Sequence, residues 1–422
     1  MIDMVASKRV GFIGGGQLAR MTAQEANHMM EQNPNLKNLE INILDPTIHC
    51  PAHEYASHHI VADFKDPDGI KQLADISDVL TYEIELGNAE FLIQLRDKGL
   101  CMYPSPETLQ IIQDKFTQKS FLRSKGIPVT DFMEINSLEE MRKDATNFGY
   151  PCMLKTRRDA YDGRGNFVIE ESSQLEAAYD RFKGRSLMLE RFVNWEKEIS
   201  VMAARDDSGE LATYPVGENT HVDNILEMTI MPARVNSETA GKAEKVARKV
   251  MEAFGDRGVF GIEMFVYDSK ILVNEVAPRV HNSGHGTLEK DAFETSQFEQ
   301  HLRAISDLQL GNTHIKRPVV MRNILGDDNG YVGPYRIENE GVFEIPGAHL
   351  HIYGKEEVRP KRKIGHISVV GNMNVYNEDG TTNIIFDEDD EAPSSDRSLE
   401  VLVRRANFAR QLIKIVPVDK HE

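Results

Sequence analysis

The amino-acid sequence predicts a protein of the α/β and α+β classes in three parts, and three observations support this. The first third alternates short apolar runs with helix-like stretches, a pattern typical of a parallel sheet with right-handed crossovers. The middle third combines longer β runs with helices, and the last part is rich in β runs and contains one amphipathic helix near its end. A chain of 422 residues also has the length of about three domains.

Each expected element of the first third follows from its local residue pattern. Short apolar runs predict strands, and a helix is expected over residues 17–29, directly after three consecutive glycines that allow a tight turn. Prolines at 104 and 106 close this part, and a further helix is expected from residue 107. The expected strands cover residues 8–13, 39–44, 60–63, 79–84 and 100–103.

The middle and last parts place helices between longer β runs. Strands are expected over residues 152–155, 167–170, 187–193, 199–204, 210–216, 259–267, 271–276, 319–324, 350–353 and 366–370. Helices are expected over residues 116–125, 174–182, 237–254 and 297–306, and near the end at Leu399, Leu402, Ala406, Ala409 and Leu412. The acidic run at 387–391 is interpreted as a solvated loop.

Composition and charge exclude several classes of protein. Lys and Arg number 49 and Asp and Glu number 67, so the formal charge is −18, which argues against general binding to nucleic acid or to anionic membranes. No apolar run is long enough to span a bilayer, and the first ten residues lack the apolar core of a signal peptide. The three cysteines are far apart and form neither a disulfide framework nor a zinc pattern. We therefore expect a cytoplasmic protein in a reducing compartment.

A glycine-rich turn, Gly14-x-Gly16-x-x-Ala19, lies between the first expected strand and the first expected helix. In outline it matches a dinucleotide-binding turn, in which N–H groups at a helix N-terminus meet an anion. Asp45, at the end of the next strand, would then hold a ribose. The pattern is weak on its own. We favour a turn in a Rossmann-like sheet, or a turn that binds another phosphate, over an NAD(P) site.

The most informative stretch is residues 259–279, where two β runs flank a short polar turn at residues 268–270. A hairpin centred on residue 269 places Glu263 directly opposite Glu275, with Cβ atoms about 4.5–5.5 Å apart. Two close carboxylates among apolar neighbours favour a divalent cation over a wet surface face, and oxygen-only ligands favour magnesium. A two-residue turn would instead make the pair diagonal neighbours, and strict alternation would point Asn274 to the other face.

Two further segments suit a nucleotide. Lys155 ends an apolar strand, where its ammonium can reach into a cleft. The following loop contains Tyr161-Asp162-Gly163-Arg164-Gly165, whose glycines and arginine suit closure over phosphates, although a plain surface loop is equally compatible with these residues. Backbone carbonyls after the β run that holds Glu190 could bind a purine amino group.

Several motifs, in order along the chain, resemble one family of enzymes. They are GFIGGGQLARM, DKFTQKSFL, KTRRDAYDGRGN, LERFVNWEKEISV, the strand pair GIEMFV and NEVAPRVHNSGH, and RPKRKIGH. Over about residues 8–370 the sequence resembles the 5-(carboxyamino)imidazole ribonucleotide synthases, which are ATP-grasp ligases of de novo purine biosynthesis. The resemblance implies a homodimer with three domains: a Rossmann-like domain over residues 1–117, an ATP-grasp domain over 118–309 with a mobile sub-block at about 150–193, and a small β-rich domain over 310–422.

The resemblance also implies roles for individual residues. Magnesium would be held by Glu263 and Glu275. ATP would contact Lys115, Lys155, Tyr161, Gly163, Arg164, Gly165, Glu190, Arg191, Phe192, Val193, Glu198, His221, Asn274 and Glu275. The ribonucleotide would contact Gly16, Gln17, Leu18, Glu83, Tyr161, Asp162, Arg164, Arg279, His285, Lys355, Arg362 and Lys363. Catalytic roles would fall to Asp162, Arg279, His281 and Asn282.

The implied reaction joins bicarbonate to the exocyclic amine of 5-aminoimidazole ribonucleotide, with conversion of ATP to ADP and phosphate. Bicarbonate is a poor electrophile, so it would first be phosphorylated to carboxyphosphate, and Asp162 or the released phosphate would accept the proton of the amine. The nearest alternative is another ATP-grasp ligase, such as a formate-dependent glycinamide ribonucleotide transformylase. A catalytically silent nucleotide-binding protein and an NAD-dependent dehydrogenase are more distant alternatives.

The 14 histidines mostly need no special role. Four of them lie between residues 49 and 59, and without a cysteine in a zinc-like spacing we interpret them as part of a polar loop. His281 and His285 are four residues apart, but the glycines beside His285 argue against a helix that presents both to a metal. Substrate contacts are the favoured interpretation for this pair.

Overall fold

The N-terminal part of the chain forms a parallel sheet with strand order β3-β2-β1-β4 in the computed structural model, which describes residues 8–33, 36, 38–158, 165–327, 329–372, 374–375 and 399–418. Helices between the strands make the crossovers that parallel pairing requires. Its elements are β1 (Lys8–Ile13), α1 (Gln17–Gln32), β2 (Leu39–Leu44), η1 (His53–Tyr55), β3 (His58–Ile60), α2 (Pro67–Asp75), β4 (Val79–Tyr82), α3 (Ala89–Arg96) and α4 (Pro106–Ile112). The parallel sheet confirms the pattern expected from the sequence, except that the run at 100–103 contributes a single bridge, from Met102 to Leu80.

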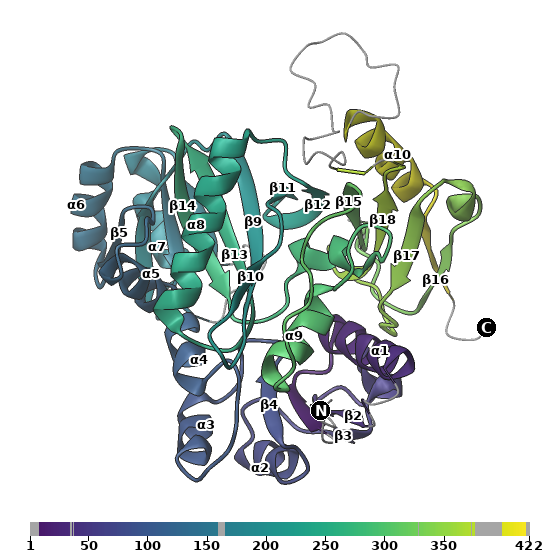
Figure 1. Ribbon diagram of the computed structural model, residues 1–422. Helices are drawn as coiled ribbons and strands as arrows, with labels where there is room; N and C mark the ends of the chain where they lie inside the picture. Colours follow the sequence, from purple (N-terminus) through teal and green to yellow (C-terminus); the bar gives the residue numbers. More distant parts are fainter. Residues whose placement is uncertain are drawn as a thin grey trace.

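A small antiparallel sheet follows, with strand order β5-β8-β6-β7. It carries helices α5 to α7 and lies to one side of a larger sheet (Figure 1). Its buried core is apolar and includes Leu154, Leu189 and Phe182. The elements are α5 (Lys115–Ser124), β5 (Phe132–Ile135), α6 (Leu138–Phe148), β6 (Cys152–Thr156), β7 (Asn166–Ile169), η2 (Ser172–Gln174), α7 (Leu175–Arg181) and β8 (Leu187–Arg191).

The larger sheet has the strand order β14-β13-β9-β11-β12-β15-β18-β17, with β10 paired to β9. Helix α8 packs against β9 and β14, and α9 lies beside α1 of the N-terminal part (Figure 1). The elements are β9 (Lys197–Arg205), β10 (Leu211–Thr213), β11 (Gly217–Val222), β12 (Ile225–Met231), α8 (Ser237–Phe254), β13 (Gly258–Tyr267), β14 (Lys270–Ala277), η3 (Asn282–Leu288), α9 (Gln297–Ile305), β15 (Val319–Leu325), η4 (Val342–Glu344), β17 (Ala348–Ile352) and β18 (Lys363–Val370).

Strands β11 and β12 form a hairpin that the sequence patterns do not predict. Its turn is Asp223-Asn224, and both residues have positive φ values of 49° and 63°. Asp and Asn tolerate this left-handed region better than other residues with a Cβ, so the dipeptide is suited to a two-residue hairpin turn. The strand expected over 210–216 is shorter in the structure, because only Leu211–Thr213 (β10) pair with β9.

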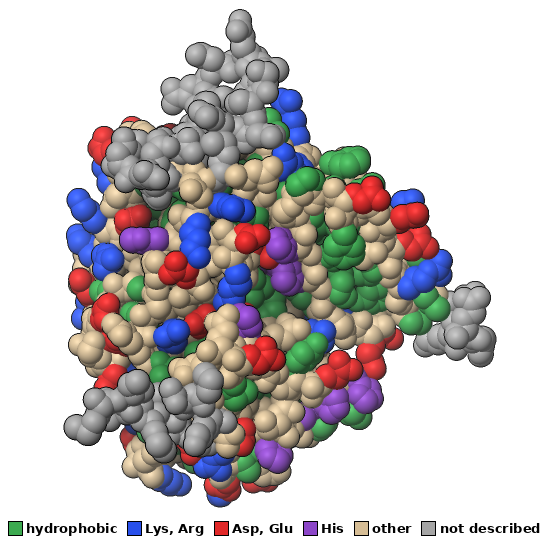
Figure 2. All heavy atoms as spheres, turned by 45° about the vertical axis from the view of Figure 1, so that its right-hand side comes forward, with side chains coloured by type: hydrophobic (Ala, Val, Ile, Leu, Met, Phe, Trp, Pro, Cys, Tyr) green, Lys and Arg blue, Asp and Glu red, His purple; other side chains and the backbone are tan. Residues whose placement is uncertain are grey.

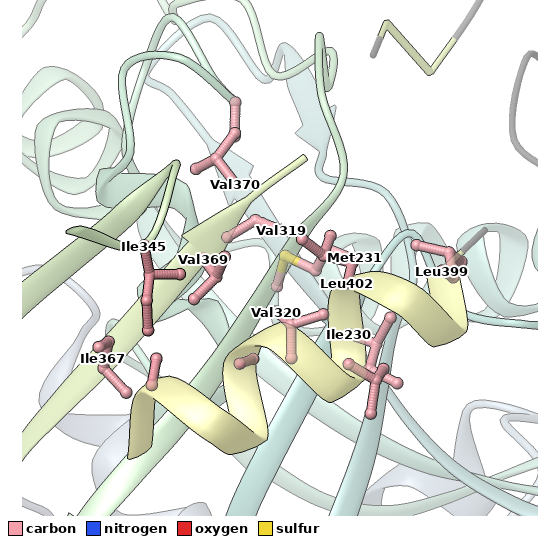
Figure 3. Close-up of a cluster of buried hydrophobic side chains, with 14 of the residues drawn as sticks. Ile230, Met231, Val319, Val320, Ile345, Ile367, Val369, Val370, Leu399 and Leu402 are labelled. Carbon is pink, nitrogen blue, oxygen red and sulfur yellow. The ribbon is translucent and has the colours of Figure 1, made fainter. Parts of the chain in front are cut away.

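The large sheet continues from the middle of the chain into its last part, because β12 pairs with β15. Residues from both sides therefore share one hydrophobic core, in which α10 (Leu399–Gln411) covers the sheet (Figure 3). Leu399 and Leu402 of α10 belong to this core together with Val320 of β15 and Ile230 of β12, and all four are labelled in Figure 3. The remaining strands, β16 (Tyr335–Glu338) and β19 (Lys414–Pro417), pair with each other.

The acidic run at 387–391 lies outside the described residues. Within the described part of the chain, no helix combines the length and the apolar character that a membrane span needs.

The shared core predicts a specific loss of stability on truncation of one side chain in β15. Ile324 is fully buried in this core, so Ile324→Ala should lower the free energy of unfolding by about 2–5 kcal/mol. The matched control is Ile48→Ala, whose side chain is 61% exposed and whose loss should cost no more than about 0.5 kcal/mol. Urea denaturation of both variants checks this; equal costs would contradict a core shared across β12 and β15.

Candidate active site

A cleft with a volume of about 1140 Å³ lies where the parallel sheet, the small antiparallel sheet and the large sheet meet. The glycine turn after β1 and the end of β4, both from the parallel sheet, line one part of the cleft. Strands β6 and β8 of the small sheet line another part. The hairpin of β13 and β14 and the segment before β18 complete the lining of the cleft. Ligand sites lie at the carboxyl ends of parallel strands in open α/β sheets, and β1 and β4 end here.

The hairpin of β13 and β14 places Glu263 directly opposite Glu275, and both side chains line the cleft. The pairing predicted from the sequence is therefore present, but the turn is not the predicted one. Only Asp268 and Ser269 form the turn, with φ values of 48° and 57°, as in a type I′ hairpin turn. Lys270 already belongs to β14.

A β-bulge restores the register that the shorter turn would have lost. Met264 pairs with Val273 and Glu263 pairs with Glu275, so Asn274 is the extra residue on β14. A bulge re-aims the side chain of the extra residue, and Asn274 lines the cleft beside the two glutamates. The expectation that strict alternation points Asn274 away is therefore wrong, because the alternation is interrupted at this residue.

The two facing carboxylates are surrounded by groups that offset their repulsion. Lys115 Nζ lies 2.7 Å from Glu275 Oε2. Burial acts to raise the pKa of Glu275, but Lys115 outweighs it and the net pKa is lowered. Burial raises the pKa of Glu263, and the neighbouring Glu275 adds to this rise. His221 bonds to Glu198 on the adjoining strands, and Glu198 and Glu263 raise its pKa against the effect of burial.

This donor set suits a magnesium ion. The two carboxylates face each other across one strand pair, and Asn274 adds an amide side chain at the same place. Magnesium is held in proteins by one or two carboxylates together with substrate phosphates and water. The chemistry of the residues therefore fits the cation that the sequence analysis expected.

A buried ion-pair network lies beside the hairpin, on α5, β6 and β8. Glu190 is 3% exposed and its carboxylate contacts Lys119 Nζ at 2.8 Å and Lys155 Nζ at 2.5 Å. Burial acts to raise the pKa of Glu190, but the two lysines outweigh it, so the carboxyl is held ionised. Thr130 also donates to this carboxylate. Lys119 was not predicted, although it follows Lys115 by four residues and so lies on the same face of α5.

An aromatic wall stands next to this network. Trp195 stacks on Phe265 with ring centroids 4.7 Å apart, and Phe192 lies 5.7 Å from Trp195. All three line the cleft, together with Val193 and Arg191. The side chain of Arg191 bonds to Asp131, so the guanidinium is directed to that carboxylate. A flat apolar surface of this kind can cover the face of a purine ring.

The glycine turn after β1 is filled by a carboxylate of the protein. Glu83 accepts hydrogen bonds from the backbone N–H groups of Gly16 and Leu18, at the N-terminus of α1. A Cβ at Gly16 would overlap this carboxylate, so a larger residue there would displace the side chain of Glu83. Burial raises the pKa of Glu83 to about 7, against the lowering effect of the two N–H groups. The backbone N–H of Gly15 donates to Asp45 at 2.9 Å. The carboxylate that would bind a ribose in a dinucleotide site is therefore already bonded within the protein.

The basic end of the cleft lies next to the glycine turn, because the charge of Glu83 acts on Lys355. Lys355, Arg362 and Lys363 line it, and Lys355 Nζ donates to the carbonyl oxygen of Lys363 at 2.7 Å. Burial lowers the pKa of Lys355 to about 7, and the nearby Arg362 and Lys363 add to this. Burial and Arg359 also lower the pKa of Arg362. An anion that binds beside these cations would stabilise their charged forms.

The segment after β14 carries the remaining predicted residues. Arg279 pairs with Glu85 at 2.8 Å, and His281 Nε2 lies 3.6 Å from Glu263 Oε1. Burial and nearby cations lower the pKa of His281 far below its usual value, so its ring is neutral near pH 7. Neither amide atom of Asn282 has a partner among the described residues. Gln297 bonds both the N–H and the carbonyl of His281, which fixes the backbone of this segment.

The cleft unites most of the residues that the sequence analysis named. Four of them, Tyr161, Asp162, Gly163 and Arg164, lie outside the described residues. His285 does not line the cleft, and its placement as a substrate contact is corrected here. The short η3 helix turns this residue inward, where it is fully buried against Phe298. Of the residues named from the sequence, those that line the cleft are Gly16, Gln17, Leu18, Glu83, Lys115, Lys155, Gly165, Glu190, Arg191, Phe192, Val193, Glu198, His221, Glu263, Asn274, Glu275, Arg279, His281, Asn282, Lys355, Arg362 and Lys363.

Three segments of the chain match known protein families. Residues 7–113 match the ribonucleotide synthetase preATP-grasp domain, and residues 120–298 match the ATP-grasp domain. Residues 319–375 match the phosphoribosylaminoimidazole carboxylase C-terminal domain. The three matches follow one another along the chain in the order that the resemblance implied.

Individual proteins of known name are similar over most of the chain. The N5-carboxyaminoimidazole ribonucleotide synthase of Bacillus subtilis is 38% identical, with 85% of this chain and 90% of that protein covered. The chain is 39% identical to the phosphoribosylaminoimidazole carboxylase of Candida albicans but spans only 64% of its length.

Solved structures agree with these sequence matches. The crystal structure of N5-carboxyaminoimidazole ribonucleotide synthetase from Thermotoga maritima superposes with a TM-score of 0.81 at 41% identity, covering 97% of this chain and 100% of that chain. The synthase from Aspergillus clavatus in complex with ADP and 5-aminoimidazole ribonucleotide superposes with a TM-score of 0.77 at 34% identity, covering 86% of this chain and 94% of that chain.

The close packing of β13 against the segment after β14 predicts the effect of one added methyl group. A Cβ at Gly261 would lie 2.5 Å from the Cβ of His281, so Gly261→Ala should push the imidazole out of its buried position. Its low pKa should then rise toward the usual value of about 6.5, which NMR titration of the ring protons measures. The control is Gly241→Ala on α8, where a Cβ has no neighbour within 4 Å. An unchanged His281 titration in Gly261→Ala would contradict this packing.

Proposed function

Because the chain belongs to the N5-carboxyaminoimidazole ribonucleotide synthase family, we propose that it carboxylates the exocyclic amine of 5-aminoimidazole ribonucleotide. ATP and bicarbonate are the other substrates, and N5-carboxyaminoimidazole ribonucleotide, ADP and phosphate are the products. The reaction is a step of de novo purine biosynthesis. One observation carries the proposal. A single cleft contains the facing carboxylates, the two lysines that are ion-paired to glutamates, and the basic end.

The acidic and lysine-rich end suits ATP. Glu263 and Glu275, with Asn274, would hold magnesium, which supplies charge neutralisation for the transferring phosphoryl group. Lys115 and Lys155 already lie at this end, ion-paired to glutamates in the structure. Because phosphoryl transfer depends mainly on position and charge, these two lysines would hold the phosphates in place. The aromatic wall of Phe192, Trp195 and Phe265 would cover the base, while Glu198 and His221 lie where the ribose would follow.

The basic end suits the phosphate of the ribonucleotide. Lys355, Arg362 and Lys363 supply the positive charge, and the glycine turn with Glu83 lies on the neighbouring wall. The Glu83 carboxyl, with a pKa of about 7, can accept or donate a hydrogen bond to ribose hydroxyls. The structure of the Aspergillus clavatus relative with ADP and 5-aminoimidazole ribonucleotide supports two ligands of this kind in one site.

The residues between the two ends would act on bicarbonate and on the amine. Arg279 and His281 would bind the bicarbonate or carboxyphosphate, since the guanidinium of Arg279 is a planar donor suited to an oxyanion. Asn282 has a buried amide without a partner, which is available to a ligand. Asp162, or the phosphate released in the site, would accept the proton of the attacking amine. Closure of the loop that holds Tyr161 would exclude water from the labile intermediate.

The proposal extends to the setting of the enzyme. We propose three domains over residues 1–117, 118–309 and 310–422, supported by the three consecutive family matches. A homodimer and a cytoplasmic location are proposed from the resemblance and from the composition. Sedimentation of the purified protein would test the dimer.

Removal of one carboxylate charge tests the proposed reaction. Glu275→Gln should lower phosphate release from ATP by at least about 100-fold while the protein stays folded, because the substitution removes the charge and keeps the shape of the side chain. The measurement is phosphate release with bicarbonate, with and without 5-aminoimidazole ribonucleotide. Glu252→Gln, on the exposed side of α8, is the control and should retain full turnover. Turnover with formate and glycinamide ribonucleotide instead would identify the alternative ligase and contradict the proposal.

Binding of the ribonucleotide should couple to proton uptake through Lys355. Its pKa of about 7 leaves the amine largely neutral at about pH 8, and a phosphate beside it favours the charged ammonium. The complex should therefore take up protons on binding, and the affinity should fall as pH rises above about 7.

Calorimetry in two buffers with different ionisation enthalpies measures this uptake. Lys355→Met should abolish it, while Lys71→Met on α2, an exposed lysine paired to Asp75, should leave it unchanged. The same uptake in wild type and Lys355→Met would show that another group titrates.

A further inference from the structure

A second cluster of metal-binding side chains lies outside the cleft, where β17, β18 and the end of η3 meet. It consists of Glu289, His349, His351 and His366, which we call the histidine cluster. Ligand atoms of Glu289, His351 and His366 lie within 4.8 Å of one another. None of the four residues lines the cleft. The sequence spacing does not reveal the cluster, because its members come from three separate segments.

Strand pairing explains how the cluster forms. His351 on β17 is directly opposite His366 on β18, so both side chains share one face of the sheet. Their rings stack with centroids 4.5 Å apart. His349 lies two residues before His351 and therefore on the same face. Glu289 meets both from the end of η3, at 3.0 Å from His351 Nε2 and 3.4 Å from His349 Nδ1.

Several nitrogen atoms of these imidazoles are buried without a partner. His366 is fully buried, and its Nε2 has no hydrogen-bond partner among the described residues. The Nε2 atom of His349 is also buried and has no hydrogen-bond partner among the described residues. A buried nitrogen without a partner costs about 1–3 kcal/mol, so the protein carries an unfavourable term here unless a ligand satisfies these atoms. The remaining nitrogen of His366 bonds to the hydroxyl of Tyr353 at 2.9 Å, which would orient the ring as an outer partner orients a metal ligand.

We propose that Glu289, His351 and His366 bind a divalent transition-metal ion of the zinc class. Imidazole nitrogens with one carboxylate favour zinc, whereas magnesium prefers oxygen ligands alone. The histidine cluster is therefore chemically distinct from the carboxylate pair of the cleft. His349 and His351 are partly exposed, which leaves an entry path from solvent. Figure 2, which brings the C-terminal part of the chain forward, shows histidine side chains on the surface among charged ones.

A metal at this place would connect two segments that lead to the cleft. Strand β17 continues through Tyr353 to Lys355, which belongs to the basic end. Glu289 closes η3, which begins at Asn282 on the cleft wall. Binding would fix these two segments to each other at a point away from the substrates. The role is structural, because none of the four side chains lines the cleft.

Cobalt(II) is a suitable probe, because its visible absorption reports a site with nitrogen ligands. The full chain is first treated with a chelator and then titrated with cobalt in excess magnesium, which occupies the oxygen-only site. We expect one equivalent to bind with micromolar or tighter affinity, to be displaced by zinc, and to raise the melting temperature. No binding at micromolar cobalt would overturn the proposal.

Two variants and one control locate the site. His351→Asn and Glu289→Gln should each weaken cobalt binding by about 100-fold or more and remove the shift in melting temperature. The melting temperature of each metal-free variant shows that it is folded. The control is His53→Asn, in the exposed pair of His53 and His59, which should bind cobalt as the wild type does. Binding that His53→Asn abolishes, or that His351→Asn leaves intact, would assign the metal to other residues.

Discussion

The structure depends on one constraint, which is that two carboxylates of like charge are held opposite each other on a β-hairpin. Glu263 and Glu275 would repel if they faced each other without compensation. A two-residue turn at one end and a bulge at Asn274 together set the register that keeps these two residues opposite each other. Lys115 then offsets the repulsion from α5, a helix that Leu122 and the two hydrogen bonds of Gln118 to Val276 hold against β14.

The surrounding sheets bring charged side chains from separate parts of the chain to this hairpin. Glu190 holds Lys119 and Lys155 in a buried network on one side, and the pKa of its carboxyl is kept low by the two lysines. On the other side, the continuous sheet carries β18 and the basic segment before it toward the same cleft. The acidic and basic ends thus come from parts of the chain that are far apart in sequence but share one sheet.

Local sequence patterns predicted most helices and strands, whereas they could not predict packing between residues far apart in the chain. The facing pair was predicted because a hairpin depends on a few consecutive residues, yet the prediction assumed the wrong turn, and the bulge at Asn274 compensated for the error. No local pattern marks a bulge, since Asn274 looks like any polar residue on a half-exposed strand. His285 was misplaced because the direction of a side chain in an irregular segment depends on what packs beneath it, here Phe298. The pairing of β12 with β15 joins residues about 90 positions apart and has no signal in either strand alone.

The most direct test of the central claim is to locate a divalent cation in crystals of the protein grown with manganese(II) and a non-hydrolysable ATP analogue. Anomalous scattering marks the manganese position without reference to any assumed site. We expect a peak within coordination distance, roughly 2.0–2.6 Å, of a carboxylate oxygen from both Glu263 and Glu275, with the phosphates completing its shell. A peak bound by phosphates alone, with Glu275 still paired to Lys115, would contradict this expectation.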